Sequence, residues 1–233
     1  MSLVFVIKNL AGLVLAADSA LTCAEVDIHG EISYQTVSIK DNKILSFANP
    51  QNFTAALTCG KADIDGKLQG EYLIEFEKKL PRKRLKVKEF AAELSAFFMA
   101  EWDRSADKTH QLELPWKRML FYVAGFDKNE TYGCLYRFSI PDTADPQELS
   151  PGHEAGVFAA IAGLRQKDIK LRFKKEQDRI LSMSVREVAD LARSWIETII
   201  DEQGADEDVK LGGPVIACTI TARDGLDCLN SGL

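Results

Sequence analysis

The sequence predicts a layered α+β protein in which helices cover stacked antiparallel sheets. Three observations lead to this prediction. Short apolar runs joined by turns open the chain, two helical stretches follow, and a third helix lies between further strand-like runs. The strand-like runs are short and rich in β-branched or aromatic residues, whereas the helical stretches repeat apolar residues about every 3.6 positions. The sequence contains no linker rich in Pro, Gly or Ser, so we expect residues 1–233 to form a single domain.

The composition excludes several classes of function. Apolar residues make up 46% of the chain and charged residues 27%, as in an ordinary globular protein. The net charge of −6 argues against a nucleic-acid partner, because binding phosphates needs a basic surface. No run reaches the ~18 apolar residues of a membrane span, and the first residues lack the pattern of a signal peptide. Five cysteines without a C-x-x-C pair predict a reducing compartment, the cytoplasm, and no disulfide framework.

The first two apolar runs, Leu3–Ile7 and Leu13–Ala17, predict a β-hairpin. Gly12 closes the turn between them and is free to adopt a positive φ. Symmetric pairing about that turn would place Ser2 opposite Asp18, with their Cβ atoms roughly 4.5–5.5 Å apart. The second residue of the chain would then lie beside a carboxylate at one end of the hairpin.

Further strands and a first helix follow the hairpin. Strand-like stretches occur at residues 31–39, 43–47 and 53–59, with turns at His29-Gly30 and Asn49-Pro50. A helix is then predicted across residues 60–80, because apolar side chains recur there close to the helical period. Its apolar stripe consists of Ile64, Leu68, Tyr72 (or Leu73) and Phe76.

A second helix is predicted over residues 86–102, where the apolar residues form one continuous stripe. These residues are Phe90, Leu94, Phe97, Phe98 and Trp102. The basic run KKLPRKRLKVK, residues 78–88, separates the two helices and contains a helix-breaking proline. We interpret this run as a solvated connector leading into a helix, and a partner-docking patch is the alternative.

The second half of the chain predicts strands on both sides of a third helix. Strands are expected at residues 119–127 and 132–140, around a turn at Lys128-Asn129, and a shorter one at residues 156–163. Ser184 and Glu187 form a capping box at the start of a helix over residues 184–200. Two closing strands are expected within residues 212–229, around a turn at Arg223-Asp224-Gly225.

Most familiar catalytic motifs are absent from the sequence. His29, His110 and His153 lie far apart, and none has the spacing that places two ligands on one metal. The sequence has no G-x-S-x-G elbow, no Walker A loop and no G-x-G-x-x-G after a strand. The cysteines are expected to be small buried apolar residues, and only Cys59, beside Gly60, invites closer inspection. We therefore expect neither a metal nor an organic cofactor.

Ser2 is the remaining candidate nucleophile. A small second residue allows the initiator Met1 to be removed, which would leave Ser2 with both a hydroxyl and a free α-amine. An α-amine has a pKa of about 7.7–8.0, so it can take the proton of the hydroxyl near neutrality. Met-Ser is also a common chain start, and a local strand-end cap formed by Asp18 with Ser19 is the alternative explanation of this stretch.

The stretch GLVLAADSALT, residues 12–22, resembles the opening hairpin of proteasome β-type subunits and their bacterial peptidase-ring relatives. These proteins are N-terminal-nucleophile (Ntn) hydrolases. Two later stretches, VAGFDKNETYGCLYRFSIP and VADLARSWI, resemble the family's G-x-D hairpin and late helix. The resemblance implies a four-layer αββα sandwich of two antiparallel sheets flanked by helices.

The resemblance also implies a set of site residues. NKILSF resembles the strand that carries the catalytic lysine, which corresponds to Lys43, with Lys40 as the alternative. LTCGKAD resembles the turn that forms the oxyanion hole, which implies the backbone N–H groups near Cys59 and Gly60 and the one at Lys61. DEDVKLGGPVIACTI resembles the D-x-x-S-G-G turn and following strand, which assigns Asp208 the role of orienting the amine.

The function implied is an amide hydrolase with Ser2 as nucleophile and Asp18, Lys43 and Asp208 supporting it. The implied partners are a peptide or protein substrate, further copies of the chain in a ring, and an unfoldase as a candidate, with no nucleic acid and no membrane. Leu211 stands where the family has a serine, and residues 156–163 contain no serine. These departures favour the alternative, a catalytically inactive structural or binding subunit of the same fold.

Overall fold

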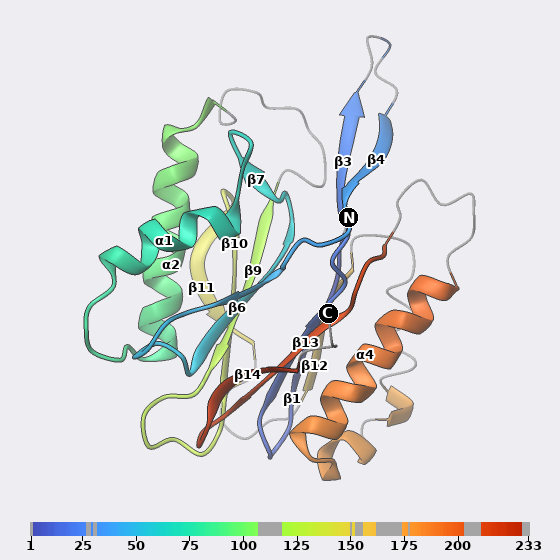
Figure 1. The fold of residues 1–233 in the computed structure, drawn as a ribbon. Coiled ribbons are helices and arrows are strands. Elements are labelled where there is room, and N and C mark those ends of the chain that lie inside the picture. Colours follow the sequence, from blue (N-terminus) through green and yellow to red (C-terminus); the bar gives the residue numbers. More distant parts are fainter. Residues whose placement is uncertain are drawn as a thin grey trace.

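The computed structural model describes residues 2–26, 29, 32–106, 118–149, 151, 156–161, 174–176, 178–202 and 211–229. Within them, two five-stranded antiparallel sheets lie face to face between two layers of helices (Figure 1). Helices α1 (Gln69–Lys79) and α2 (Val87–Arg104) cover one sheet, and α4 (Val185–Asp201) covers the other. The predicted αββα sandwich is therefore confirmed.

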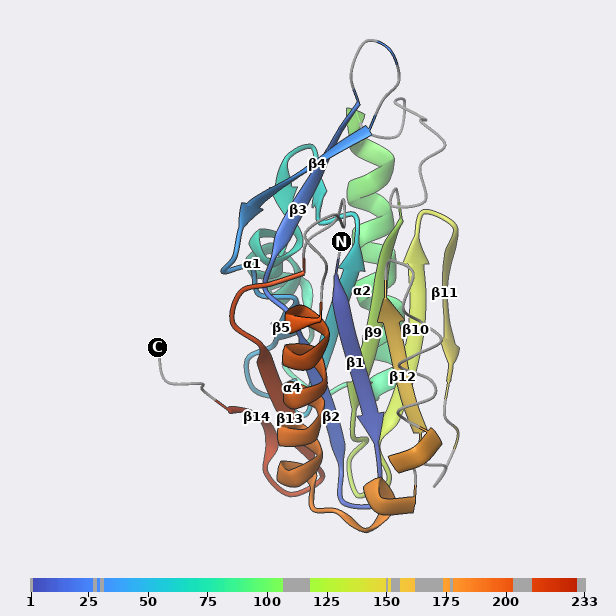
Figure 2. The same cartoon turned by 90° about the vertical axis from the view of Figure 1, so that its right-hand side faces the viewer.

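One sheet contains the first and last strands that the structure describes, and it is called here the N-terminal sheet. In spatial order its strands are β12 (Gly156–Ile161), β1 (Leu3–Lys8), β2 (Leu13–Ala17), β13 (Ile216–Thr221) and β14 (Gly225–Leu229). Helix α4 runs along its outer face (Figure 2). The predicted capping box starts this helix, because Ser184 Oγ accepts a hydrogen bond from the backbone N–H of Glu187 while the Glu187 carboxylate accepts one from the N–H of Ser184.

The other sheet is built from the middle of the chain and is called here the central sheet. Its strands, in order, are β11 (Thr143–Glu148), β10 (Cys134–Ile140), β9 (Met119–Gly125), β6 (Thr54–Gly60) and β5 (Ile44–Ser46). Two further sheets have two strands each: β3 (Leu21–Val26) pairs with β4 (Ile32–Ser38), and β7 (Asp63–Ile64) pairs with β8 (Lys67–Leu68). Strands β3 and β11 were not predicted, because neither run shows the apolar pattern of a buried strand.

The core has three parts, which follow the layers. Between the sheets lie aliphatic side chains of both, including Val4, Val6, Leu15, Ala55, Leu57 and Ala124. Beneath α1 and α2 the core is aromatic, and Phe98 packs on Phe121 with ring centroids 4.8 Å apart. Beneath α4 it is mostly aliphatic, with Trp195 packed against Phe5. The apolar stripe predicted for the second helix therefore faces the core.

The predicted register of the first hairpin is wrong by one residue. Ile7 pairs with Val14 rather than with Leu13, so Leu3, not Ser2, lies opposite Asp18. The turn is tighter than expected because the Asn9 side chain accepts hydrogen bonds from the N–H groups of residues 11 and 12.

Gly12 does not make use of its freedom to adopt a positive φ. This position excludes a side chain because a Cβ would lie 2.6 Å from the carbonyl oxygen of Ile220 on β13. Close packing against the neighbouring strand, rather than turn conformation, therefore accounts for the glycine.

The helix predicted over residues 60–80 is correct only in its second half. Residues 63–68 form the small β7–β8 hairpin, whose turn contains Asp65 and Gly66 with positive φ, and α1 begins at Gln69. Ile64 still packs in the same core as Tyr72 and Phe76, so side chains from a hairpin and a helix imitate one helical stripe. The basic run that follows is the connector between α1 and α2, as predicted.

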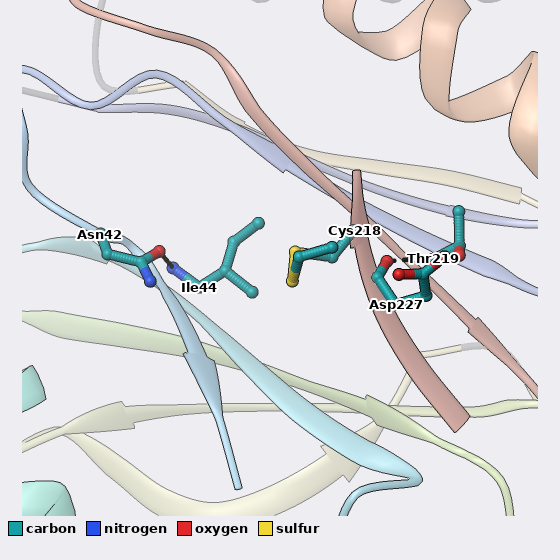
Figure 3. Close-up of a disulfide and its surroundings, with 6 residues drawn as sticks. Asn42, Ile44, Cys218, Thr219 and Asp227 are labelled. Carbon is teal, nitrogen blue, oxygen red and sulfur yellow. Dashed lines mark hydrogen bonds between the residues drawn. A yellow bond between two sulfur atoms is a disulfide. The ribbon is translucent and has the colours of Figure 1, made fainter. Parts of the chain in front are cut away.

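The expectation of buried, unlinked cysteines is wrong for one pair. Cys218 and Cys228 form a disulfide between the paired strands β13 and β14. Figure 3 shows this bond at the edge of the N-terminal sheet, with the side chain of Ile44 extending toward it from β5. Cys218 is buried but Cys228 is exposed, so Cys228 is not a core residue. The two cysteines lie symmetrically about Arg223, the centre of the hairpin, and this symmetry was the signal that could have revealed the pair.

In the part of the chain that the structure describes, none of the helices is long and apolar enough to cross a membrane.

Candidate functional site

A buried ion pair joins the two sheets at one end of the sandwich. Lys43 Nζ lies 2.6 Å from Asp18 Oδ1, and these side chains are only 4% and 0% exposed. Asp18 follows β2 of the N-terminal sheet and Lys43 precedes β5 of the central sheet. The pair therefore forms only when the two sheets pack against each other.

Backbone N–H groups complete the surroundings of the Asp18 carboxylate. Oδ1 also accepts a hydrogen bond from Leu3 N at 2.9 Å, and Oδ2 accepts from Ala20 N at 3.3 Å and Gly212 N at 3.4 Å. A buried carboxylate needs such partners, because removing it from water is costly unless it is paired and hydrogen-bonded. Since Leu3 N belongs to the peptide bond that follows Ser2, the carboxylate contacts the N-terminal segment through its backbone rather than through the Ser2 side chain.

The neighbouring strand fixes the position of Lys43. Thr58 on β6 donates to the carbonyl of Lys43 from its N–H at 2.9 Å and from its hydroxyl at 3.3 Å. Asn42 accepts a hydrogen bond from Ile44 N at 3.0 Å and so holds the start of β5 (Figure 3). Lys40, the alternative lysine, is exposed and lies outside this arrangement. Lys43 is therefore the lysine that the structure brings to Asp18.

Ser2 lies beside this pair at a cavity. The cavity is open to solvent on one side, the empty space in it and at its mouth is about 280 Å³, and Ser2 is 6% exposed. Lys43, Thr58, Cys59 and Gly60 line the same cavity. Four of the predicted site residues therefore line the same cavity: Ser2, Lys43, Cys59 and Gly60. Asp18 contacts this group through its ion pair with Lys43.

The end of β6 has the backbone geometry of a tight turn at the cavity. Gly60 has φ +91°, and a Cβ there would lie 2.1 Å from the carbonyl oxygen of Arg118, so only glycine fits. The N–H of Lys61 donates to that same carbonyl at 2.9 Å. Because the N–H of Lys61 already makes this hydrogen bond, it does not match the expected oxyanion donor. The backbone N–H groups of Cys59-Gly60 remain as the candidate donors.

Burial controls the ionisation of two further groups in the cavity. Burial raises the pKa of the Cys59 thiol to about 12, with the neighbouring Lys43 ammonium opposing the effect and the Asp18 carboxylate adding to it. A thiol with this pKa is protonated at neutral pH and is a poor nucleophile. Burial likewise raises the pKa of Asp41 above its ordinary value, opposed by Lys43.

The glycine turn before β13 packs against the end of β2. The Ser19 hydroxyl lies 2.9 Å from the carbonyl oxygen of Ile39 and 2.7 Å from that of Pro214. Gly213 has φ +73°, and a Cβ at this position would lie 2.5 Å from Ser19 Oγ. Leu211, just before the turn, packs against the core beneath α4. Asp208 lies outside the described residues.

Sequence reasoning missed three polar residues at the cavity. Asp41, Thr58 and Gln69 line it. Asp41 and Gln69 belong to no motif that the sequence analysis singled out, and Thr58 lies within LTCGKAD but was assigned no role there. Asp41 and Thr58 are next but one to Lys43 and Gly60, so sequence proximity to predicted site residues was the available signal. Among the described residues, no group of three or more His, Cys, Asp or Glu side chains could hold a metal ion.

Comparisons with known proteins relate this geometry to a known fold. No protein-family model matches the chain, and no curated protein matches it. Among solved structures, the chain is similar to the Anbu (Gly-1) mutant from Hyphomicrobium sp. strain MC1, with 14% identity and a TM-score of 0.58. The similarity covers 99% of this chain and 86% of that one. This chain has a proteasome-like Ntn fold. At 14% identity, this structural similarity shows the fold of the chain and does not show its function.

Proposed function

We propose that this proteasome-like chain is an N-terminal-nucleophile amide hydrolase that cleaves peptides or proteins. Ser2 acts as nucleophile once processing leaves it as the first residue. The observation that supports this proposal best is the Lys43–Asp18 pair, buried with a separation of 2.6 Å behind a cavity that Ser2 lines. A buried ion pair beside a hydroxyl in a cavity is the kind of polar arrangement that catalytic sites maintain.

The proposed chemistry has two steps. Ser2 Oγ attacks the amide carbonyl while the α-amine of Ser2 takes its proton, and the protonated amine then gives that proton to the leaving nitrogen as the C–N bond breaks. The acyl group remains as an ester on Ser2. Water, deprotonated by the same amine, then hydrolyses the ester and restores the hydroxyl.

The surrounding residues stabilise charge in these steps. The Lys43 ammonium, positioned by Asp18, lowers the electrostatic cost of the developing alkoxide. The backbone at Cys59-Gly60 provides the oxyanion donor, an interaction worth about 2.7–4 kcal/mol per donor in measured enzymes. Asp208 orients the α-amine. The proposed reaction uses no cofactor.

We further propose a single domain over residues 1–233 and a cytoplasmic ring of identical copies, with an unfoldase as a candidate partner. The proteasome-like fold of the neighbour supports an oligomeric assembly. In the reducing cytoplasm, Cys218 and Cys228 would be kept as two free thiols rather than as a disulfide. The ring therefore has to be stable without this bond. Native mass spectrometry of the reduced protein measures the ring size directly.

The deciding experiment combines N-terminal mass with activity. Protein expressed without a tag before Met1 is expected to begin at Ser2 and to hydrolyse fluorogenic peptides. Ser2→Ala is expected to lower kcat/KM by at least about 10³-fold without changing the melting temperature, because it removes only the nucleophile. Ser2→Thr, which keeps a hydroxyl, is the matched control and is expected to retain activity.

The alternative function is a catalytically inactive structural or binding subunit. Leu211 favours it, because an apolar side chain packs into the core beneath α4 where the family resemblance implies a hydroxyl. A mature chain that retains Met1, or wild-type hydrolysis no faster than that of Ser2→Ala, would reject the enzyme and leave this alternative.

A further inference from the structure

The cavity beside Ser2 is lined by three charged side chains, and the two cations already have partners. Lys43 pairs with Asp18 at 2.6 Å, and Lys61 pairs with Asp63 at 3.3 Å. Asp41 makes no ion pair with another described residue. One negative charge on the cavity wall is therefore left without a matching cation.

Asp41 is held in place by the backbone and is partly withdrawn from water. Its N–H donates to the carbonyl oxygen of Ser19 at 2.9 Å, which ties the segment before β5 to the end of β2. The side chain is half-buried, and burial raises its pKa, opposed by the Lys43 ammonium. A partly desolvated carboxylate gains more from a cation brought by a ligand than a fully hydrated carboxylate does.

The remaining walls suit a long side chain with a charged end. Leu21 and Ala62 contribute apolar surface, while Thr22 and Gln69 are polar and uncharged. Gln69 is fixed, because its Nε2 donates to the carbonyl of Lys61 at 2.5 Å. Lysine and arginine side chains combine an apolar stem with a cationic tip, and they bury the stem while the tip reaches a polar partner.

We infer that Asp41 determines specificity, so that the cavity accepts the lysine or arginine side chain preceding the amide that Ser2 attacks. This inference rests on the proposed function, since the side chain next to the scissile carbonyl is the one closest to the nucleophile. The α-amine of Ser2 does not cancel the Asp41 charge in the reacting state, because an amine that accepts a proton is neutral. The substrate class is therefore peptides cleaved after basic residues.

The experiment compares three fluorogenic peptides that differ only in the residue before the fluorophore: lysine, leucine or glutamate. The wild-type protein is expected to favour lysine over glutamate by about tenfold or more in kcat/KM, because a charge-assisted hydrogen bond forms only with lysine. Asp41→Asn is expected to remove most of this preference, and Asp41→Lys to reverse it. An unchanged lysine-to-glutamate ratio in Asp41→Asn would overturn the inference while leaving Ser2 as the proposed nucleophile.

Glu93→Gln is the matched control. Glu93 is exposed on α2, away from the cavity, so this variant changes the net charge equally but is expected to keep the wild-type ratio. A ratio that falls equally in Glu93→Gln would assign the preference to overall charge and would overturn the role of Asp41.

A binding measurement separates this inference from the proposed function. Peptides ending in lysine or glutamate are titrated into Ser2→Ala with and without Asp41→Asn. If the wild-type protein hydrolyses nothing but the lysine peptide still binds more tightly in an Asp41-dependent way, the proposed hydrolysis fails and the basic-ligand pocket stands. If hydrolysis fails and neither peptide shows Asp41-dependent binding, both are overturned.

Discussion

Two ion pairs in this molecule have the same length but lie in opposite surroundings. Lys43–Asp18 and Lys67–Glu75 both have N–O distances of 2.6 Å. The first pair is buried between the sheets, whereas the second, joining β8 to α1, has side chains that are 34% and 51% exposed. Water screens the second pair and hydrates its charges when the pair separates. Burial, rather than distance, is therefore expected to decide how strongly the stability of the protein depends on an ion pair.

The largest effect is expected from breaking the buried pair on one side. Lys43→Met leaves the Asp18 carboxylate buried with only backbone donors, and breaking a buried pair in this way costs about 3–5 kcal/mol of folding free energy. Urea unfolding measures this loss. The double variant Asp18→Asn/Lys43→Met, which removes both charges, should recover most of it. A loss below about 1 kcal/mol in Lys43→Met would mean that the pair behaves like a surface pair.

An intermediate effect is expected from the covalent link at the sheet edge. The Cys218–Cys228 disulfide joins a buried residue to an exposed one across 10 residues of sequence. For a loop of this length, the chain-entropy model gives a stabilisation of about 2–3 kcal/mol. Unfolding with and without dithiothreitol measures it. Cys218→Ala/Cys228→Ala is the control and should not respond to the reductant, and equal stability of wild type with and without reductant would contradict the prediction.

The smallest effect is expected from the exposed pair. Glu75→Gln removes one charge but keeps a hydrogen-bond acceptor, and no resolved change in the melting temperature is expected at physiological salt. The hydrogen bond from Lys67 lowers the pKa of Glu75 below its ordinary value of 4.5. Any stabilisation from the pair is therefore present above pH 4.5 and lost as the pH falls through the lower folded-state value.

Thermal melts of wild type and Glu75→Gln at pH 7 and pH 3 test both statements. A large difference at pH 7 would show that exposure does not weaken this pair, and a difference that grows on acidification would contradict the expected direction of the pH dependence.

The layers of the fold were predictable because they depend on local periodicity. Phe90, Leu94 and Phe98 on α2 follow the helical repeat, and the sequence alone indicates that this face is buried. The same reasoning failed at Ile64, where a hairpin residue continues the spacing of the helix that follows. The spacing of apolar residues indicates which side chains are buried. It does not indicate whether those side chains belong to one helix or to a hairpin followed by a helix.

The register of the strands was less predictable than their existence. In the first hairpin, two hydrogen bonds to the Asn9 side chain shorten the turn and shift every pair by one residue. In the last hairpin, a one-residue difference in the turn centre decides whether Cys218 faces Cys228. Both errors come from turn geometry, which depends on individual hydrogen bonds rather than on composition.

The sequence by itself determined the order of the helices and of most strands, the buried face of α2 and, through a family resemblance, the candidate residues Ser2, Asp18 and Lys43. Only the tertiary structure decided that Lys43 rather than Lys40 meets Asp18, and that Asp41 shares a cavity with Ser2. The physical reason is that Asp18 and Lys43 lie 25 positions apart at the ends of strands in different sheets. Their contact follows from how two apolar sheet faces pack together, and no local pattern contains that information.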